Sequence, residues 1–342
     1  MTIMRTAFAA ATLAAAFLAA PAEANDTQAA LGLGGLIFER SDQIAMESED
    51  LYLSHDKVRV RYTYRNLTDK PVTILVAFPL PDVPVEGRDP EWIESAYPDW
   101  DAIGMNTSVD GKQVQLMRVD IPKLGGKDIS ARLKELGWPV RFWQDDDFPA
   151  RLSALSADDK SELVGEGLLS ADRLTGHELR PLWTVSTAFV RTQTFPPGKA
   201  VTVEHAYEPM IGGTVTSALD RDVREDSMAG PDGYEARYCV DRSFLSGYDR
   251  RRYTADGGLN ATVMPVETWL SYVLATGANW KGPIKRFKLT VDKPGPQVLV
   301  SLCMDGLTRV SPNRFEVVKT DFEPTRDIEI LMVELISTDD EV

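Results

Sequence analysis

The side chains that most often carry chemistry are sparse in this sequence. The three histidines, His55, His177 and His205, are far apart, and none lies within four residues of another. Protein zinc ligands usually come in such close pairs, so this spacing does not predict a metal site. Neither Gly-x-Ser-x-Gly nor His-Glu-x-x-His occurs, so the commonest serine-hydrolase and zinc-peptidase signatures are missing. We therefore predict no catalytic, metal-binding or cofactor-binding residues.

Acidic side chains outnumber basic ones by 52 to 37, which raises the question of whether two of them act together. Asp82 and Glu86 follow a strand pattern and precede an aromatic loop, which suits a carboxylate-based hydrolase acting on an envelope or extracellular glycan. Such an enzyme needs two carboxyl groups facing each other at about 5 to 10 Å. The acidic runs at 145–147 and 220–226 are typical of solvated helix ends and loops.

The loop at 86–104 is a candidate surface for a partner or ligand. Trp92, Tyr97 and Trp100 stand there among acidic residues, at spacings that match neither a strand face nor a helical stripe. Exposed aromatic rings on a loop are typical anchors for a ligand or partner. The alternative is that these rings fold back and cap the open end of a β-sandwich.

Arg250, Arg251 and Arg252 form the one basic cluster of an acidic chain, and they are a second candidate surface. Three guanidinium groups suit an anionic ligand or an acidic partner. The alternative is that they pair with acidic residues of the same chain.

The only two cysteines, Cys239 and Cys303, both lie inside patterns that we interpret as strands. In an exported protein, an even pair predicts a disulfide more readily than a metal or catalytic site.

The N-terminus predicts export. Arg5 precedes an apolar run from Ala7 to Ala20, and Ala22 and Ala24 give the small-x-small pattern that signal peptidase cleaves, so we predict cleavage after Ala24. The run is too short for a spanning helix of about 20 residues, and no later segment resembles one. We expect a periplasmic or secreted protein of 318 residues (342 − 24). Its net charge of −15 argues against nucleic acid and anionic lipid, although acidity by itself identifies no ligand. We expect an unidentified protein or glycan of the envelope as the partner.

Alternating residues at 58–82 and 182–209 predict two β-hairpins that position these groups. In the first, Val58, Val60, Tyr62 and Tyr64 alternate with polar residues, and turn residues follow from Asn66. Hairpins of this size need a second layer, so we predict a mainly β protein, an antiparallel β-sandwich or two packed sandwiches.

The hydrophobic period becomes helical at about 127–175, where we predict a short helical insertion that covers one edge or end of the sheet. From Tyr234 onward, including YEARYCV, the pattern reads as all β. We divide the chain into a signal peptide at 1–24, an N-terminal β part at 25–210 and a C-terminal β part at 211–342.

Four long segments resemble a known family. They are NDTQAALGLGGLIFERSDQIAMESEDLYLS, VRVRYTYRNLTDKPVTILVAFPLPD, TFPPGKAVTVEHAYEP and GANWKGPIKRFKLTVDK. They resemble the exported bacterial proteins of the domain of unknown function 4424 family, over nearly the whole mature chain. That resemblance implies no activity. The strand pair that runs into FPLP also resembles, over about 25 residues, the N-terminal part of vault/inter-α-trypsin domains, which implies a β module.

Three functions remain open from the sequence. The first is a non-catalytic binding or interaction module of the envelope. The second is the carboxylate-based hydrolase. The third is a purely structural envelope component.

Overall fold

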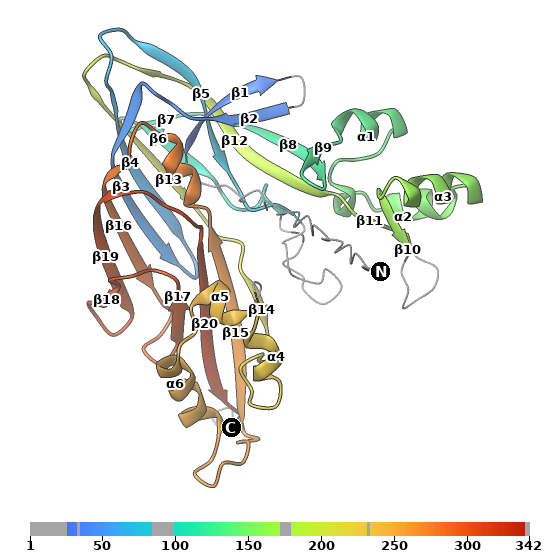
Figure 1. The fold of residues 1–342 in the computed structure, drawn as a ribbon, viewed down its shortest axis with the longest axis vertical. Coiled ribbons are helices and arrows are strands. Elements are labelled where there is room, and N and C mark those ends of the chain that lie inside the picture. The colour runs from blue at the N-terminus through green and yellow to red at the C-terminus, as the bar shows by residue number, and fades with distance from the viewer. Residues whose placement is uncertain are drawn as a thin grey trace, which may run out of the picture.

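A computed structural model describes residues 26–32, 35–83, 97, 99–171, 179–230 and 233–338. It shows an elongated, mainly β molecule of several largely antiparallel sheets (Figure 1). This confirms the predicted mainly β, sandwich-like class. Among the described residues, no helix has both the length and the apolar character needed to cross a membrane.

The largest sheet that the structure describes has eight strands. Its order is β18 (Thr308–Arg309), β19 (Arg314–Phe322), β16 (Ile284–Asp292), β3 (Ile44–Ser54), β4 (Val58–Asn66), β13 (Ala200–Tyr207), β6 (Asn106–Val109) and β7 (Lys112–Gln113). Neighbouring strands are antiparallel except β16 and β3, which are parallel. Strands from both sides of residue 210 therefore share this sheet.

Two further sheets pack against the same face of the eight-stranded sheet. One has the order β2 (Gly35–Glu39), β1 (Thr27–Gly32), β5 (Val72–Pro79), β12 (Thr184–Phe195), β8 (Met117–Leu124) and β9 (Lys127–Asp128). The other has the order β14 (Gly212–Thr214), β15 (Val263–Tyr272), β20 (Ile328–Ser337) and β17 (Leu299–Leu302). All three sheets contribute to one core, in which the hydroxyls of Tyr62 and Tyr272 lie 2.9 Å apart.

The two predicted hairpins are wrong, although their strands are correct. β4 and β5 lie in different sheets, as do β12 and β13, so each turn is a corner that carries the chain from one layer to the other. The two corners lie together because the buried Asn66 donates from its side chain to the carbonyls of Lys70 and Phe195, at 2.7 and 2.8 Å. Turn residues look alike in hairpins and in corners, so the local sequence did not distinguish them.

The predicted helical insertion is confirmed. α1 (Ser130–Leu136), the 3-10 turn η2 (Phe142–Gln144), α2 (Phe148–Ser153) and α3 (Ala157–Gly165) gather with the short strands β10 (Leu169–Ala171) and β11 (Leu179–Pro181). They enclose a second core around the fully buried Trp183, at the end of β8 and β12 (Figure 1). The insertion thus covers one end of the six-stranded sheet.

The segment from Tyr234 to Arg252 was predicted as strand and is helical. Three short helices lie along the four-stranded sheet: α4 (Arg224–Met228), α5 (Tyr234–Tyr238) and α6 (Arg242–Arg252). A 3-10 turn, η3 (Ala275–Asn279), follows β15 in the sequence. Tyr234 and Tyr238 are four residues apart and share a helix face, with ring centroids 5.2 Å apart. Over so short a segment, alternation and helical spacing were both compatible with the sequence.

Candidate functional site

A buried group of charged and polar side chains lies between the six-stranded and eight-stranded sheets. Asp26, just before β1, has no exposed surface, and Arg191 on β12 and His205 on β13 are almost as buried. Arg191 Nη2 and Nη1 donate to the two carboxylate oxygens of Asp26 at 2.7 and 3.3 Å. His205 Nε2 lies 3.1 Å from Asp26 Oδ1. An ion pair that excludes water this completely fixes the two sheets relative to each other.

Burial and neighbouring groups together determine the protonation of Asp26 and His205. Burial alone would raise the pKa of Asp26, but the positive Arg191 and the hydrogen bond from His205 more than offset it and hold that pKa well below its usual range. Burial lowers the pKa of His205, so its imidazole is neutral at neutral pH. His205 Nε2 then donates to Asp26, and Nδ1 accepts from Thr107 Oγ1 at 2.7 Å. Asp26 and Arg191 thus compensate each other, and the group has no net charge.

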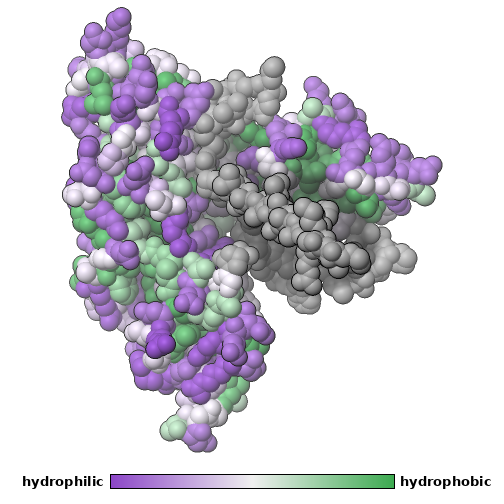
Figure 2. All heavy atoms as spheres, viewed as in Figure 1, coloured by the Kyte–Doolittle hydropathy of each residue, from purple (hydrophilic) through white to green (hydrophobic). Residues whose placement is uncertain are grey.

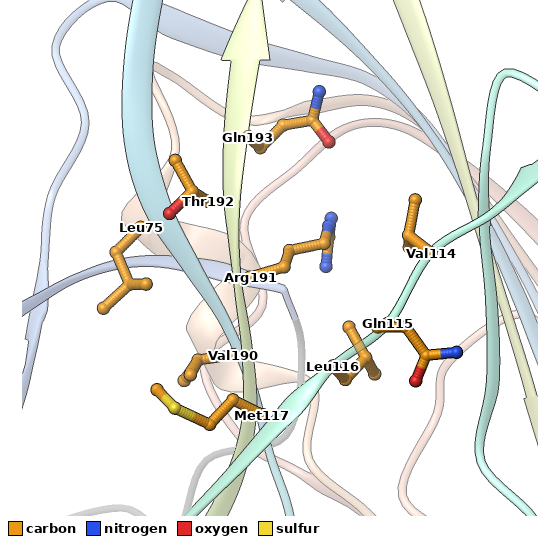
Figure 3. A pocket seen from close by; sticks show the side chains of 9 residues that line it. All are labelled: Leu75, Val114, Gln115, Leu116, Met117, Val190, Arg191, Thr192 and Gln193. Atoms are coloured by element: carbon orange, nitrogen blue, oxygen red, sulfur yellow. The ribbon is translucent and has the colours of Figure 1, made fainter.

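A cavity of about 370 Å³ opens beside this group, between β12 and the segment that leads into β8 (Figure 3). Its volume is near the lower end of the range for small-molecule sites. Its walls come from β12 and β5 on one side and from residues 114–117 on the other. The lining residues are Leu75, Val114, Gln115, Leu116, Met117, Val190, Arg191, Thr192 and Gln193.

Arg191 joins the ion pair to the cavity. Its side chain extends from β12 toward Val114 and Leu116 (Figure 3), and only 4% of it is exposed. Both Nη atoms are hydrogen-bonded to Asp26, and Arg191 Nε is buried with no hydrogen-bond partner among the described residues. Its surroundings leave no space for an acceptor atom beside Nε, so the ion pair borders the cavity but offers it no free donor.

The aromatic loop only partly meets its prediction. Trp100 is 4% exposed and belongs to the main core, so it is no surface anchor, and for this ring the capping alternative is correct. Tyr97 is half-buried and packs against Phe142 and Trp143 of the helical insertion, with centroids 5.7 and 5.4 Å apart. Trp92 lies outside the described residues. Apolar rings with core neighbours within reach are stabilised more by burial than by exposure.

The three arginines do not form one anion-binding surface. Successive residues on α6 point in different directions. Arg252 is 9% exposed and pairs with Asp220 through Nε and Nη2, at 2.9 and 2.8 Å, so it is not free for a partner. Arg251 donates to the carbonyl of Gln297, and Arg250 is exposed. For Arg252, the alternative interpretation is therefore correct: it pairs with an acidic residue of the same chain.

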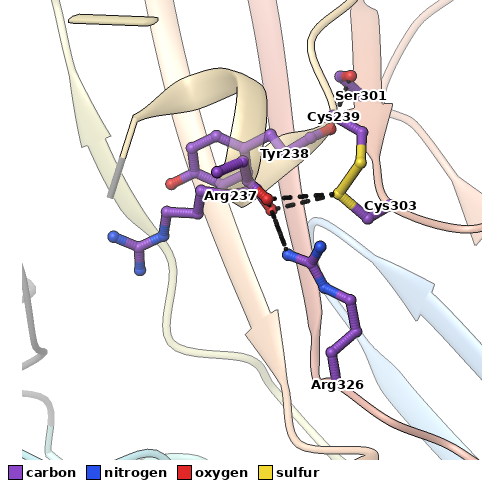
Figure 4. Close-up of a disulfide and its surroundings, with 7 residues drawn as sticks. Arg237, Tyr238, Cys239, Ser301, Cys303 and Arg326 are labelled. Atoms are coloured by element: carbon purple, nitrogen blue, oxygen red, sulfur yellow. Dashed lines mark hydrogen bonds between the residues drawn. A yellow bond between two sulfur atoms is a disulfide. The ribbon is translucent and has the colours of Figure 1, made fainter. Parts of the chain in front are cut away.

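The predicted disulfide is confirmed, because Cys239 and Cys303 are bonded (Figure 4). Cys303 directly follows β17 and does not lie within it, so its predicted place inside a strand is off by one residue. Cys239 is not in a strand but ends α5 in the left-handed region, at φ 54°. Arg326 Nη2 also donates to the carbonyls of Ala236 and Arg237, at 3.1 and 3.0 Å. The disulfide and Arg326 together hold the end of α5 near β17.

The remaining candidates do not assemble into a site within the described residues. Asp82 accepts a hydrogen bond from Ser186, and Glu86, its suggested partner, lies outside those residues, as does His177. His55 is hydrogen-bonded through Nδ1 to the neighbouring Asp56 near the surface. The structure groups no three His, Cys, Asp or Glu side chains for a metal ion in the part of the chain that it describes.

Sequence reasoning missed Asp26 and Arg191. One signal was present: Arg191 falls in the same alternation as Val185, Phe189 and Phe195, so it stands at an inward position of a strand, where a charge needs a partner. The partner itself was not recognisable, since Asp26 lies 165 residues away.

The chain belongs to the family described as "Domain of unknown function (DUF4424)", whose model matches residues 24–331. No curated protein matches it. Among solved structures, it is similar to one described as a putative nutrient binding protein from Legionella pneumophila, at 15% identity, with a TM-score of 0.43 and coverage of 91% of this chain and 70% of that one.

It is also similar to an M1 zinc metallopeptidase from Deinococcus radiodurans, at 8% identity, with a TM-score of 0.28. That match covers 86% of this chain and 43% of the peptidase. Both TM-scores are below 0.5, so we draw nothing about this chain from either structure.

Proposed function

We propose that this protein is an exported, non-catalytic binding module that holds a small ligand in the cavity between β12 and residues 114–117. The observation that carries the proposal is the edge of β12 at this cavity, where pairing with β8 stops at Val190 and Thr192 follows among the lining residues. The backbone N–H and C=O of such a residue need hydrogen-bond partners, and no other described strand supplies them on this side. A ligand in the cavity accounts for this edge.

The lining chemistry favours binding over catalysis. Among the described residues that line the cavity, Arg191 alone is ionisable, and its guanidinium stays protonated near neutral pH, so it cannot act as a general base. The other polar side chains are the two amides of Gln115 and Gln193 and the hydroxyl of Thr192. These groups orient a ligand but supply neither a general base nor an activated nucleophile.

Export rests on the N-terminal signal pattern and agrees with the disulfide, since such bonds persist mainly in oxidising compartments such as the periplasm. The acidic surface agrees with a protein that stays away from anionic lipid, and hydrophilic residues dominate the face seen in Figure 2. The envelope is therefore where we expect the ligand.

Native mass spectrometry of protein purified from the envelope fraction, without denaturation, tests this function. We expect a bound compound in the wild type, and we expect it to be lost in Leu116→Trp, which fills the cavity. Leu259→Trp is the matched control, because Leu259 is 53% exposed and lies in a turn beside Tyr253, away from the lining residues. A compound retained by Leu116→Trp, or absent from the wild type, would contradict the proposal.

A further inference from the structure

The cavity lies along an unpaired stretch of strand edge. β12 pairs with β5 from Ala188 to Phe195, but its pairing with β8 on the other side stops at Val190, opposite Met117. Before Met117 the chain diverges from β12 and joins the other layer, where Val114 N–H donates to the carbonyl of Thr107 at 3.0 Å. From residue 191 onward, no other strand that the structure describes pairs with this edge of β12.

The hydrogen-bond alternation shows which backbone groups face that opening. Thr187 accepts from Leu80 N–H, and Val185 exchanges both backbone bonds with Val83, so odd-numbered residues of β12 point toward β5 and its extension. In an antiparallel ladder, the groups of intervening residues point the opposite way. The N–H and C=O of Thr192 thus point into the opening, where Thr192 lines the cavity. Farther along the same edge, Gln193 Nε2 donates to the carbonyl of Thr194 at 2.9 Å.

The electrostatics of the cavity favour an uncharged ligand. Arg191 is already neutralised by Asp26, and the remaining described lining residues carry no charge. A free anion would gain little from a compensated guanidinium and would be repelled by a chain of net charge −15. An uncharged amide brings hydrogen-bonding groups to the cavity without adding charge beside the neutralised pair.

We infer that the ligand is a short peptide, or a compound with the same amide backbone, that adds a strand to the open edge of β12. This inference rests on the proposed function. One amide unit of the ligand exchanges backbone hydrogen bonds with Thr192, as in β-augmentation. Leu75, Leu116 and Met117 then cover small apolar side chains.

The test uses the whole mature protein and an uncharged probe, N-acetyl-alanyl-valyl-alanine amide. Methionine is labelled with ¹³C in its methyl group, and the signal of Met117, which is 54% exposed at the cavity, is assigned with Met117→Leu. We expect the probe to shift this signal in a saturable way. An analogue methylated on the valine nitrogen should bind about three- to tenfold more weakly, because it lacks one backbone donor.

Two proline variants provide matched controls on the same edge. Thr192→Pro removes the N–H that faces the cavity, and since that N–H is not used in pairing with β5, we expect the fold to persist and binding to weaken by about three- to tenfold. Thr194→Pro removes an N–H on the same edge at a residue that does not line the cavity, and we expect it to bind like the wild type.

Glucose separates this inference from the proposed function. If glucose shifts the Met117 signal and the capped peptide does not, the cavity binds ligands but the amide class is wrong. If the peptide binds equally well after N-methylation and to Thr192→Pro, strand addition is wrong. The proposed function itself fails on the mass-spectrometric comparison of Leu116→Trp with Leu259→Trp.

Discussion

Replacing either member of the Asp26–Arg191 pair should destabilise the protein severely. Asp26 accepts two hydrogen bonds from Arg191, one from His205 and a longer one, at 3.4 Å, from the hydroxyl of Tyr64. Asp26→Asn removes the negative charge and leaves the guanidinium uncompensated in a dry site. Breaking a buried ion pair in this way costs about 3–5 kcal/mol of unfolding free energy.

The double variant Asp26→Asn with Arg191→Met closes a cycle with the two single variants and separates the pair from its surroundings. Because it removes both charges, we expect it to be no less stable than the single variants, which implies a coupling energy of about 3 kcal/mol. Arg191→Met alone should resemble Asp26→Asn. As a control, Arg65→Met removes one member of the more exposed Arg65–Glu47 pair and should change the unfolding free energy much less than either buried single variant.

Urea unfolding followed by tryptophan fluorescence measures these free energies, and Trp280, whose indole donates to the Asp26 carbonyl at 2.6 Å, reports on the site. The pKa of Asp26 is lower in the folded protein, so its contribution is fully present above its unfolded pKa of 3.8 and is lost on further acidification. Asp26→Asn should therefore reduce the loss of unfolding free energy on acidification below pH 3.8. Single-variant losses below about 1 kcal/mol, or losses that simply add in the double variant, would refute this reasoning.

Four further predictions concern other parts of the chain. Reducing the disulfide between Cys239 and Cys303, which spans 64 residues, should lower the unfolding free energy by about 4 kcal/mol, seen as a lower urea midpoint in reductant. Trp100→Ala should cost about 3–5 kcal/mol, and an unchanged midpoint would restore the surface interpretation. Burial raises the pKa of Asp327 to about 6 in the folded protein. The stability that its protonated carboxyl contributes is therefore fully present below pH 3.8 and is lost as the pH rises through 6. Asp327→Asn should remove this fall in stability from a pH series of urea midpoints. N-terminal sequencing of exported protein should begin at Asn25, and an uncleaved chain would refute the signal peptide.

Local patterns predicted the elements of this fold better than their partners. The alternation at Val58, Val60, Tyr62 and Tyr64 gave both strand β4 and its buried face correctly. It did not show that β5, after the turn, belongs to another sheet, because that depends on packing between layers. Trp100 shows the same limit, since its burial is decided by a core that the loop itself does not encode.

The candidate site was harder to predict than the fold. Its key contact joins Asp26 and Arg191, which are far apart in sequence, and the inward position of Arg191 on its strand does not identify Asp26 as the partner. The cavity depends on where β8 stops pairing with β12, and the residues around Met117 carry no local signal for that divergence. The disulfide was predictable because the chain has only two cysteines.

A crystal structure of the protein purified from its native envelope fraction, without unfolding, tests the central claim most directly. We expect a bound compound in the cavity between β12 and residues 114–117, within hydrogen-bond distance of the backbone of Thr192. A cavity that holds only water, while a compound occupies another part of the surface, would contradict the account.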